Sequence, residues 1–79
     1  MTTQERIRRD FTYHPPHGTQ ASRYGEIRMR FGELALVLTA LCPDSRERNV
    51  AITKIEEAVF WANAAIARNE PEVPGDDRL

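Results

Sequence analysis

With 79 residues the chain is large enough for one small domain, and its single cysteine excludes an intrachain disulfide and a cysteine metal cluster. It lacks an apolar run long enough to span a membrane, and its first residues do not form a secretory signal, so we expect a cytoplasmic protein. A formal net charge of −1 argues against a protein that binds DNA or RNA polymers, which usually needs a broadly basic surface.

The charges are nevertheless unevenly distributed along the chain. Residues 1–30 contain six arginines and three acidic residues, a net of +3, whereas residues 31–79 contain five basic and nine acidic residues, a net of −4. All the basic residues except Lys54 are arginine, whose planar guanidinium group suits phosphate or carboxylate. The net positive charge is therefore confined to the N-terminal part of the chain, residues 1–30.

Residues 3–12 (TQERIRRDFT) are predicted to form a short helix, with Thr2 or Thr3 as its N-cap and with Ile7 and Phe11 one turn apart. A helix of about three turns is not stable alone, so it has to dock on another part of the protein.

Residues 13–18 (YHPPHG) end this helix. The two consecutive prolines predict a stiff extended bend, and Gly18 permits the turn into the next element. Such a bend would fix the directions of the Tyr13 and His14 side chains.

A long helix is predicted from about Gln20 to Leu41, with Thr19 as its N-cap. Gly25 and Gly32 share one face of it and indicate either close packing of a second helix or the close approach of a ligand. The apolar residues form a heptad stripe, namely Tyr24, Ile27, Phe31, Leu34, Leu38 and Leu41.

Pro43 ends that helix, and Asp44 followed by Glu47 fits a capping box for a second long helix over residues 45–69. Because the connection is short, the two long helices are expected to form an antiparallel hairpin. Residues 70–79 (EPEVPGDDRL) have the composition of a disordered acidic tail, which leaves residues 1–69 as the domain.

The second long helix carries more apolar surface than one neighbouring helix covers. Its main stripe is Ile52, Ile55, Val59, Ala62 and Ile66, and further apolar residues flank it at Val50, Ala58, Phe60, Trp61, Ala64 and Ala65. A core of this size supplies only about 3–5 kcal/mol unless disulfides, metals or other subunits add to it. The predicted fold is therefore an all-α antiparallel helical hairpin with a short N-terminal helix, assembled into a homo-oligomer.

The candidate binding residues lie around the bend. Tyr13 and His14 have planar side chains that are able to stack on nucleobases. Arg23, Arg28 and Arg30 lie in the first turns of the long helix, where free N–H groups and the helix dipole also favour an anion. This combination suits a small nucleotide with phosphates. The alternative is that Tyr13 only fixes the loop and that the arginines are solvated.

No catalytic motif is recognisable. His14 and His17 have no carboxylate or cysteine at metal-ligand spacing, and a glycine-rich phosphate loop and a nucleophile motif are both missing. We therefore expect no enzyme activity, metal or cofactor.

Two stretches carry a resemblance to a known family. FTYHPPHGTQASRYGEIR at residues 11–28 and CPDSRERNVAITKIEEAVFWANAAIARN at residues 42–69, with an apolar helix between them, resemble the phage cyclic-nucleotide "sponges" that blunt the bacterial CBASS response. These proteins share a hairpin domain with a Thoeris-inhibiting relative. The resemblance covers roughly residues 10–69.

The resemblance implies a function. Members of that family bind cyclic dinucleotides such as cyclic GMP-AMP and hold them without cleavage, in the cytoplasm of the infected bacterium, so that the immune effector stays inactive. They assemble as hexamers of hairpins with dinucleotide pockets between paired subunits, and some also bind cyclic trinucleotides at separate sites.

It also implies residue roles. Tyr13 matches a tyrosine that stacks on a base, and Arg28 matches a basic residue, often lysine, that contacts phosphate. The remaining ligand candidates are His14, Arg23, Tyr24 and Arg30, with Asn63 and Arg68 for a trinucleotide site unless they only pack at the helix end.

Two other functions remain open from the residues. One is a helical interaction protein that caps a host protein through its apolar flank. The other is a small nucleotide-processing enzyme that uses His14 and His17.

Overall fold

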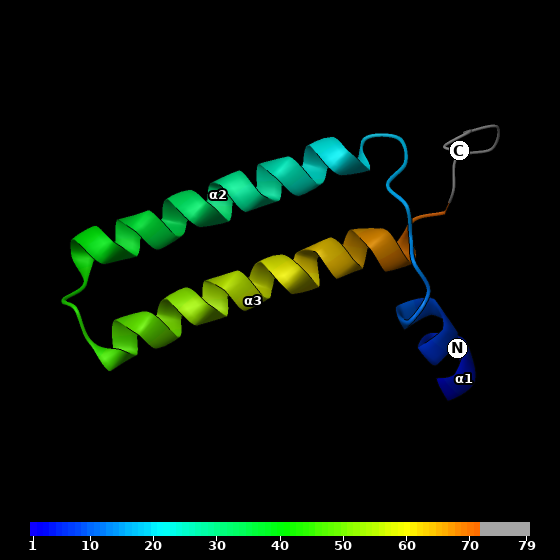
Figure 1. Ribbon diagram of the computed structural model, residues 1–79, viewed down its shortest axis with the longest axis horizontal. Coiled ribbons are helices and arrows are strands. Elements are labelled where there is room, and N and C mark those ends of the chain that lie inside the picture. The colour runs from blue at the N-terminus through cyan, green and yellow to red at the C-terminus, as the bar shows by residue number, and fades with distance from the viewer. Residues whose placement is uncertain (72–79) are drawn as a thin grey trace.

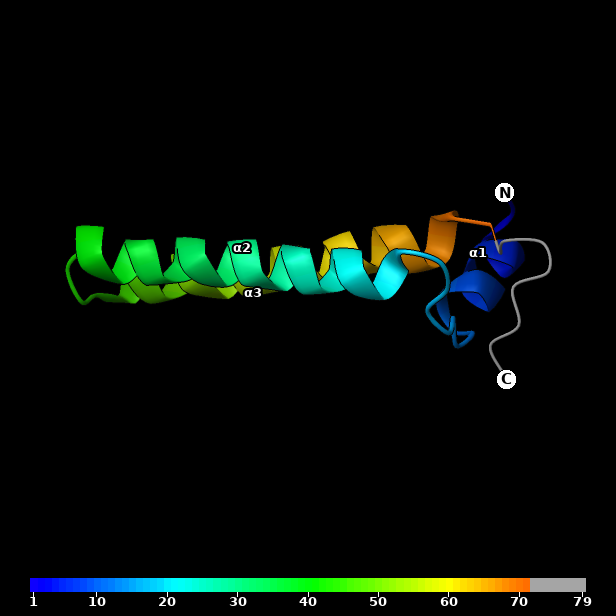
Figure 2. The ribbon, with the colours of Figure 1, turned by 90° about the horizontal axis from the view of Figure 1, so that it is seen from above.

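The computed structural model describes residues 1–71, whose regular structure is entirely helical: α1 (Thr3–Asp10), α2 (Gln20–Leu41) and α3 (Arg46–Asn69) (Figure 1). The long helices α2 and α3 lie side by side and antiparallel, and α1 lies at the end where α2 begins and α3 ends (Figure 2). The predicted all-α hairpin with a short N-terminal helix is confirmed. Most of the predicted tail lies outside the described residues.

None of the described helices has the length and apolar character that crossing a membrane requires.

Helix α1 begins as predicted, because the Thr2 hydroxyl accepts a hydrogen bond from the Glu5 N–H at 3.1 Å. It ends at Asp10, earlier than predicted, and Phe11 is 85% exposed. The contacts that dock α1 on α3 are polar: Arg9 Nη1 donates to Asn69 Oδ1 at 2.9 Å, and Asp10 pairs with Arg68. Ile7 and Phe11, the apolar pair suggested by the sequence spacing, stay exposed and do not dock this helix.

The turn between the long helices differs from the predicted capping box. Ser45, not Asp44, is the N-cap of α3, and its hydroxyl accepts a hydrogen bond from the Arg48 N–H at 3.1 Å. The Asp44 carboxylate instead pairs with the Arg48 guanidinium at 3.0 Å. That guanidinium also donates to the Cys42 carbonyl at 3.4 Å, next to the end of α2. A basic residue in the third helical position thus replaces the acid that a capping box uses.

The apolar stripe of α3 is half-buried along its whole length, consistent with packing on α2. The heptad stripe of α2 is half-buried only in part, because Leu34 is 46% and Leu41 is 76% exposed, and Ala35 and Cys42 are half-buried instead. A straight helix of 3.6 residues per turn drifts by about 20° per heptad against a 3.5 repeat. The strict heptad prediction is therefore wrong for the second half of α2.

A single chain does not bury an apolar core. Among the described residues none of the hydrophobic side chains is buried, and the large ones that remain exposed on the two long helices are Met29, Leu34, Leu36, Val37, Leu41, Val50, Phe60 and Trp61. A Cβ added at Gly32 would meet nothing within 4 Å, so this glycine does not mark close helix packing within one chain. The apolar surface is available to other molecules.

Candidate functional site

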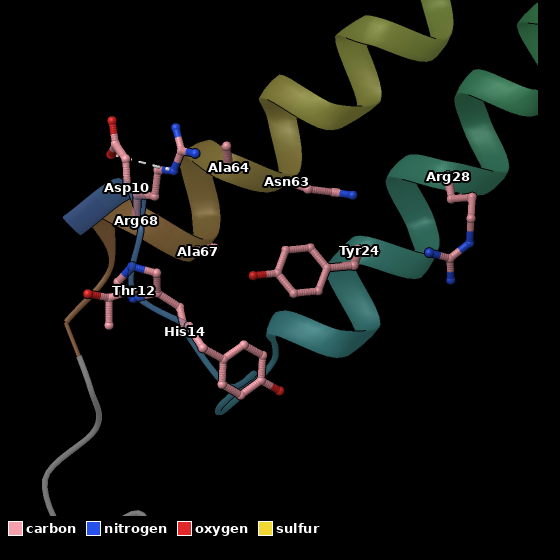
Figure 3. A pocket seen from close by; sticks show the side chains of 10 residues that line it. Asp10, Thr12, His14, Tyr24, Arg28, Asn63, Ala64, Ala67 and Arg68 are labelled. Atoms are coloured by element: carbon pink, nitrogen blue, oxygen red, sulfur yellow. Dashed lines mark ion pairs between the residues drawn. The ribbon is translucent and has the colours of Figure 1, made fainter. Parts of the chain in front are cut away.

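A hollow of about 400 Å³ lies where α1, the following loop, the start of α2 and the end of α3 meet (Figure 3). Its volume lies within the usual range for a small-molecule site. The residues that line it are Asp10, Thr12, Tyr13, His14, Tyr24, Arg28, Asn63, Ala64, Ala67 and Arg68. The structure thus brings together most of the predicted site residues, and it leaves out Arg23 and Arg30.

The loop presents Tyr13 and His14 differently. The His14 ring is half-buried, and its Nε2 lies 2.7 Å from the Arg9 carbonyl, which only accepts hydrogen bonds, so Nε2 carries the proton. The Thr12 hydroxyl donates to the Arg8 carbonyl at the same helix end. The Tyr13 ring is 80% exposed. His14 therefore anchors the loop, and Tyr13 remains free to stack on a ligand.

Tyr24 and Arg28 are one turn apart on α2, so they share a face of the helix. Figure 3 shows the Tyr24 ring directed across the hollow toward α3. The Arg28 side chain is exposed, and it forms no ion pair within residues 1–71. A Cβ at Gly25 would lie 3.9 Å from Arg28 Nη2. Arg28 therefore lines the hollow as a cation without an ionic partner in the described part of the chain.

Helix α3 supplies the opposite wall. Ala64 and Ala67 are small and leave room, and the Asn63 Oδ1 is buried without a hydrogen-bond partner among the described residues. Arg68 Nε lies 3.5 Å from Asp10 Oδ1 at the edge of the hollow. A hydrogen bond from Arg9 is the main cause that lowers the pKa of Asp10, against its desolvation. The α3 wall therefore offers the Asn63 Oδ1 acceptor and the Arg68 guanidinium group, which is paired with Asp10 of α1.

The other two predicted arginines have partners outside the hollow. Arg30 Nε pairs with Glu26 at 2.9 Å, and both side chains are exposed. Arg23 forms two hydrogen bonds with Glu70, Nη1 to Oε2 at 2.7 Å and Nη2 to Oε1 at 2.6 Å. These bonds, together with a hydrogen bond from Gln20, lower the pKa of Glu70 to about 2, and the bonds to Glu70 raise the pKa of Arg23. Glu70, which the composition placed in the tail, is held at the end of the hairpin.

Sequence reasoning missed several lining residues. Asp10 directly follows two arginines and precedes the bend, which is a signal for an ion pair at that end. Ala64 belongs to the apolar flank of the second long helix and Ala67 has no marker in the sequence, because small residues carry no chemical signal of their own. Ala64 and Ala67 contribute to the hollow only because the tertiary structure places the loop and α2 opposite them.

Comparison with protein families identifies residues 3–67 with the model described as the Acb2/Tad1 hairpin domain. The chain belongs to the Acb2/Tad1 hairpin family. Comparisons with curated proteins and with solved structures give no match. The family comprises anti-CBASS and anti-Thoeris proteins that sequester cyclic nucleotides, and these proteins act by binding rather than as enzymes.

The hollow of this Acb2/Tad1 hairpin combines two tyrosine rings with the Arg28 guanidinium group and the Asn63 Oδ1 acceptor, neither of which has a partner within residues 1–71. No group of three or more His, Cys, Asp and Glu side chains within residues 1–71 is arranged to hold a metal ion.

Proposed function

We propose that this protein binds cyclic dinucleotides such as cyclic GMP-AMP in the hollow and sequesters them without cleaving them, so that CBASS signalling in the cytoplasm of the infected bacterium is blocked. Cyclic trinucleotides are a second proposed ligand class. One observation carries the proposal: Tyr13, Tyr24 and Arg28, from the loop and α2, line one hollow in which Arg28 has no ionic partner among the described residues.

The roles follow from side-chain chemistry. Tyr13 stacks on a base, which contributes about 1–3 kcal/mol per base at other sites. Arg28 donates to a phosphate oxygen, because its planar fork suits two parallel hydrogen bonds. Asn63 Oδ1 accepts a hydrogen bond from a base of a cyclic trinucleotide, the ligand class for which the resemblance offers this residue, since an unsatisfied buried acceptor otherwise costs about 1–3 kcal/mol. Tyr24 forms the wall against which the sugar and base pack.

A homo-oligomer, with a hexamer as the proposed form, completes the site. A cyclic dinucleotide has two similar halves, and a two-fold interface presents the same residues to each half. The absence of a buried apolar side chain among the described residues of one chain, together with exposed Phe60 and Trp61, supports assembly through the long helices.

The decisive experiment is calorimetry of the purified protein with a panel of cyclic di- and trinucleotides. We expect at least one of them to bind with a Kd well below about 10 μM, roughly −7 kcal/mol. The ligand is then recovered by heating the complex and identified by mass spectrometry. Failure of every ligand to bind refutes the proposal, and recovery of a linear product points to an enzyme instead.

A further inference from the structure

The only buried residue among residues 1–71 is a polar one, Gln20, which is 2% exposed. Its Oε1 accepts a hydrogen bond from the His17 N–H at 3.1 Å in the loop. Its Nε2 donates to the Ile66 carbonyl at 3.4 Å and to Glu70 Oε1 at 3.0 Å. One amide therefore connects the loop, the start of α2 and the end of α3.

Arg23 extends this connection. Two of its nitrogens hold the Glu70 carboxylate, and its Nε donates to the Thr19 hydroxyl at 3.0 Å. Thr19 occupies the N-cap position of α2, but its hydroxyl forms no capping hydrogen bond with the helix backbone. The chain of bonds thus runs from His17 through Gln20, Glu70 and Arg23 back to the loop at Thr19.

The loop between α1 and α2 is consequently held at both ends. The His14 ring is bonded to the Arg9 carbonyl at one end, and the His17 N–H is bonded to Gln20 at the other. Pro15 and Pro16 lie between these two anchors and limit the backbone angles there. Tyr13 directly precedes the first anchor.

We propose that Gln20, Arg23 and Glu70 form a clamp that positions the loop carrying Tyr13 over the hollow. Arg23 then acts as a positioning residue and does not contact the ligand phosphate. This inference rests on the proposed function, since it names what prepares that site. A loop ordered in advance loses less conformational freedom on binding, so the clamp increases affinity without touching the ligand.

The two roles of Arg23 predict opposite results for Glu70→Ala. If Arg23 positions the loop, release of the clamp weakens binding of cyclic GMP-AMP, by about fivefold to tenfold at unchanged stoichiometry. If Arg23 is a phosphate ligand, loss of the competing carboxylate strengthens binding. The double variant Arg23→Glu with Glu70→Arg restores the ion pair in reverse but not the hydrogen bond from Gln20, because a guanidinium group has no acceptor, so the clamp predicts that it recovers part of the affinity lost in Glu70→Ala. No recovery, or tighter binding by Glu70→Ala, overturns the inference.

A matched control is available on the same helix. Glu26→Ala removes the partner of Arg30 in an exposed pair outside the hollow. It changes the net charge as much as Glu70→Ala does, and it is expected to leave the Kd unchanged.

Hydrogen exchange of the ligand-free protein provides a test that does not depend on binding. In Glu70→Ala the backbone N–H of His17 is expected to exchange several-fold faster, because its acceptor Gln20 loses a support. The N–H of Val59, in the middle of the hairpin, serves as the internal reference and is expected to keep its rate. Equal His17 rates in both proteins refute the clamp, whereas failure of the wild type to bind any cyclic nucleotide refutes the proposed function.

Discussion

Asp10 of α1 and Arg68 of α3 face each other at the edge of the hollow, with Asp10 Oδ1 3.5 Å from Arg68 Nε. Arg9 Nε reaches the same oxygen at 2.9 Å, so two guanidinium groups share one carboxylate. The Asp10 carboxyl is ionised at neutral pH, as aspartates normally are, and the hydrogen bond from Arg9 lowers its pKa further. The hollow that we propose for an anionic ligand therefore contains an anion of its own.

Removal of that charge is expected to strengthen ligand binding. Asp10→Asn retains an oxygen for Arg9 and frees Arg68, so cyclic GMP-AMP should bind about two- to fivefold more tightly at low salt, with a smaller gain at high salt. Calorimetry at two salt concentrations measures this. Asp44→Asn, at the far end of the hairpin, is the control. Weaker binding by Asp10→Asn would contradict this expectation, and it would mean either that the carboxylate contacts the ligand or that the Asp10–Arg68 pair is needed to dock α1 on α3.

Tyr13 and Arg28 are expected to contribute most of the affinity for a cyclic dinucleotide. Tyr13→Ala and Arg28→Ala should each weaken binding at least tenfold, because one loses a stacking surface and the other loses the phosphate contact. Tyr13→Phe keeps the ring and should bind nearly as the wild type does. Light scattering checks the assembly of each variant, and loss of assembly would show that these residues are structural.

The apolar surface of α3 predicts an oligomer. Light scattering of the wild type should give a mass near six chains, and a stable monomer would contradict the proposal. Phe60 is 63% exposed in one chain, so Phe60→Glu should change the stability of the single hairpin little. If this face packs on another subunit, the buried charge should dissociate the oligomer and lower its mass in light scattering. Lys54→Glu, at an exposed polar position of the same helix, is the control and should keep the assembly.

The Arg23–Glu70 pair predicts a pH dependence of stability. Hydrogen bonds from Arg23 and Gln20 lower the pKa of Glu70 from 4.5 to about 2, so the unfolded chain binds more protons between these values. The stabilisation is fully present above pH 4.5 and is lost as the pH falls toward 2.

Thermal unfolding of wild type and Glu70→Gln provides the measurement. The difference in Tm should be larger at about pH 7 than at about pH 3. It should also decrease in concentrated salt, since both side chains are partly exposed to solvent. A difference in Tm that does not change with pH would contradict the ion pair.

The local parts of the fold were predictable from the sequence. The bounds of α2 and α3 agree with the prediction because Pro15, Pro16 and Pro43 forbid helix at set positions and the apolar spacing between them is helical. Gly18 has a φ of 56°, as its place after the bend suggested. The resemblance at residues 11–28 and 42–69 led to the correct family.

Two local features were nevertheless predicted wrongly. Which of Asp44 and Ser45 caps α3 was decided by Arg48, whose guanidinium attracts the carboxylate and leaves the hydroxyl to the helix. The outward rotation of Leu34 and Leu41 follows from the pitch of a straight helix, which a heptad count ignores.

Some residues of the candidate site were predictable from the sequence, and others were not. Tyr13 and Arg28 were identifiable from their neighbours in the sequence, whereas the partner of Arg23 is 47 residues away, in a segment whose composition suggested disorder. Charge patterns along a chain do not reveal which carboxylate a guanidinium reaches, since that depends on how α2 and α3 align at the open end of the hairpin. The sequence by itself therefore determined the helices and the chemistry available, and only the tertiary structure decided which arginines remain free to bind an anion.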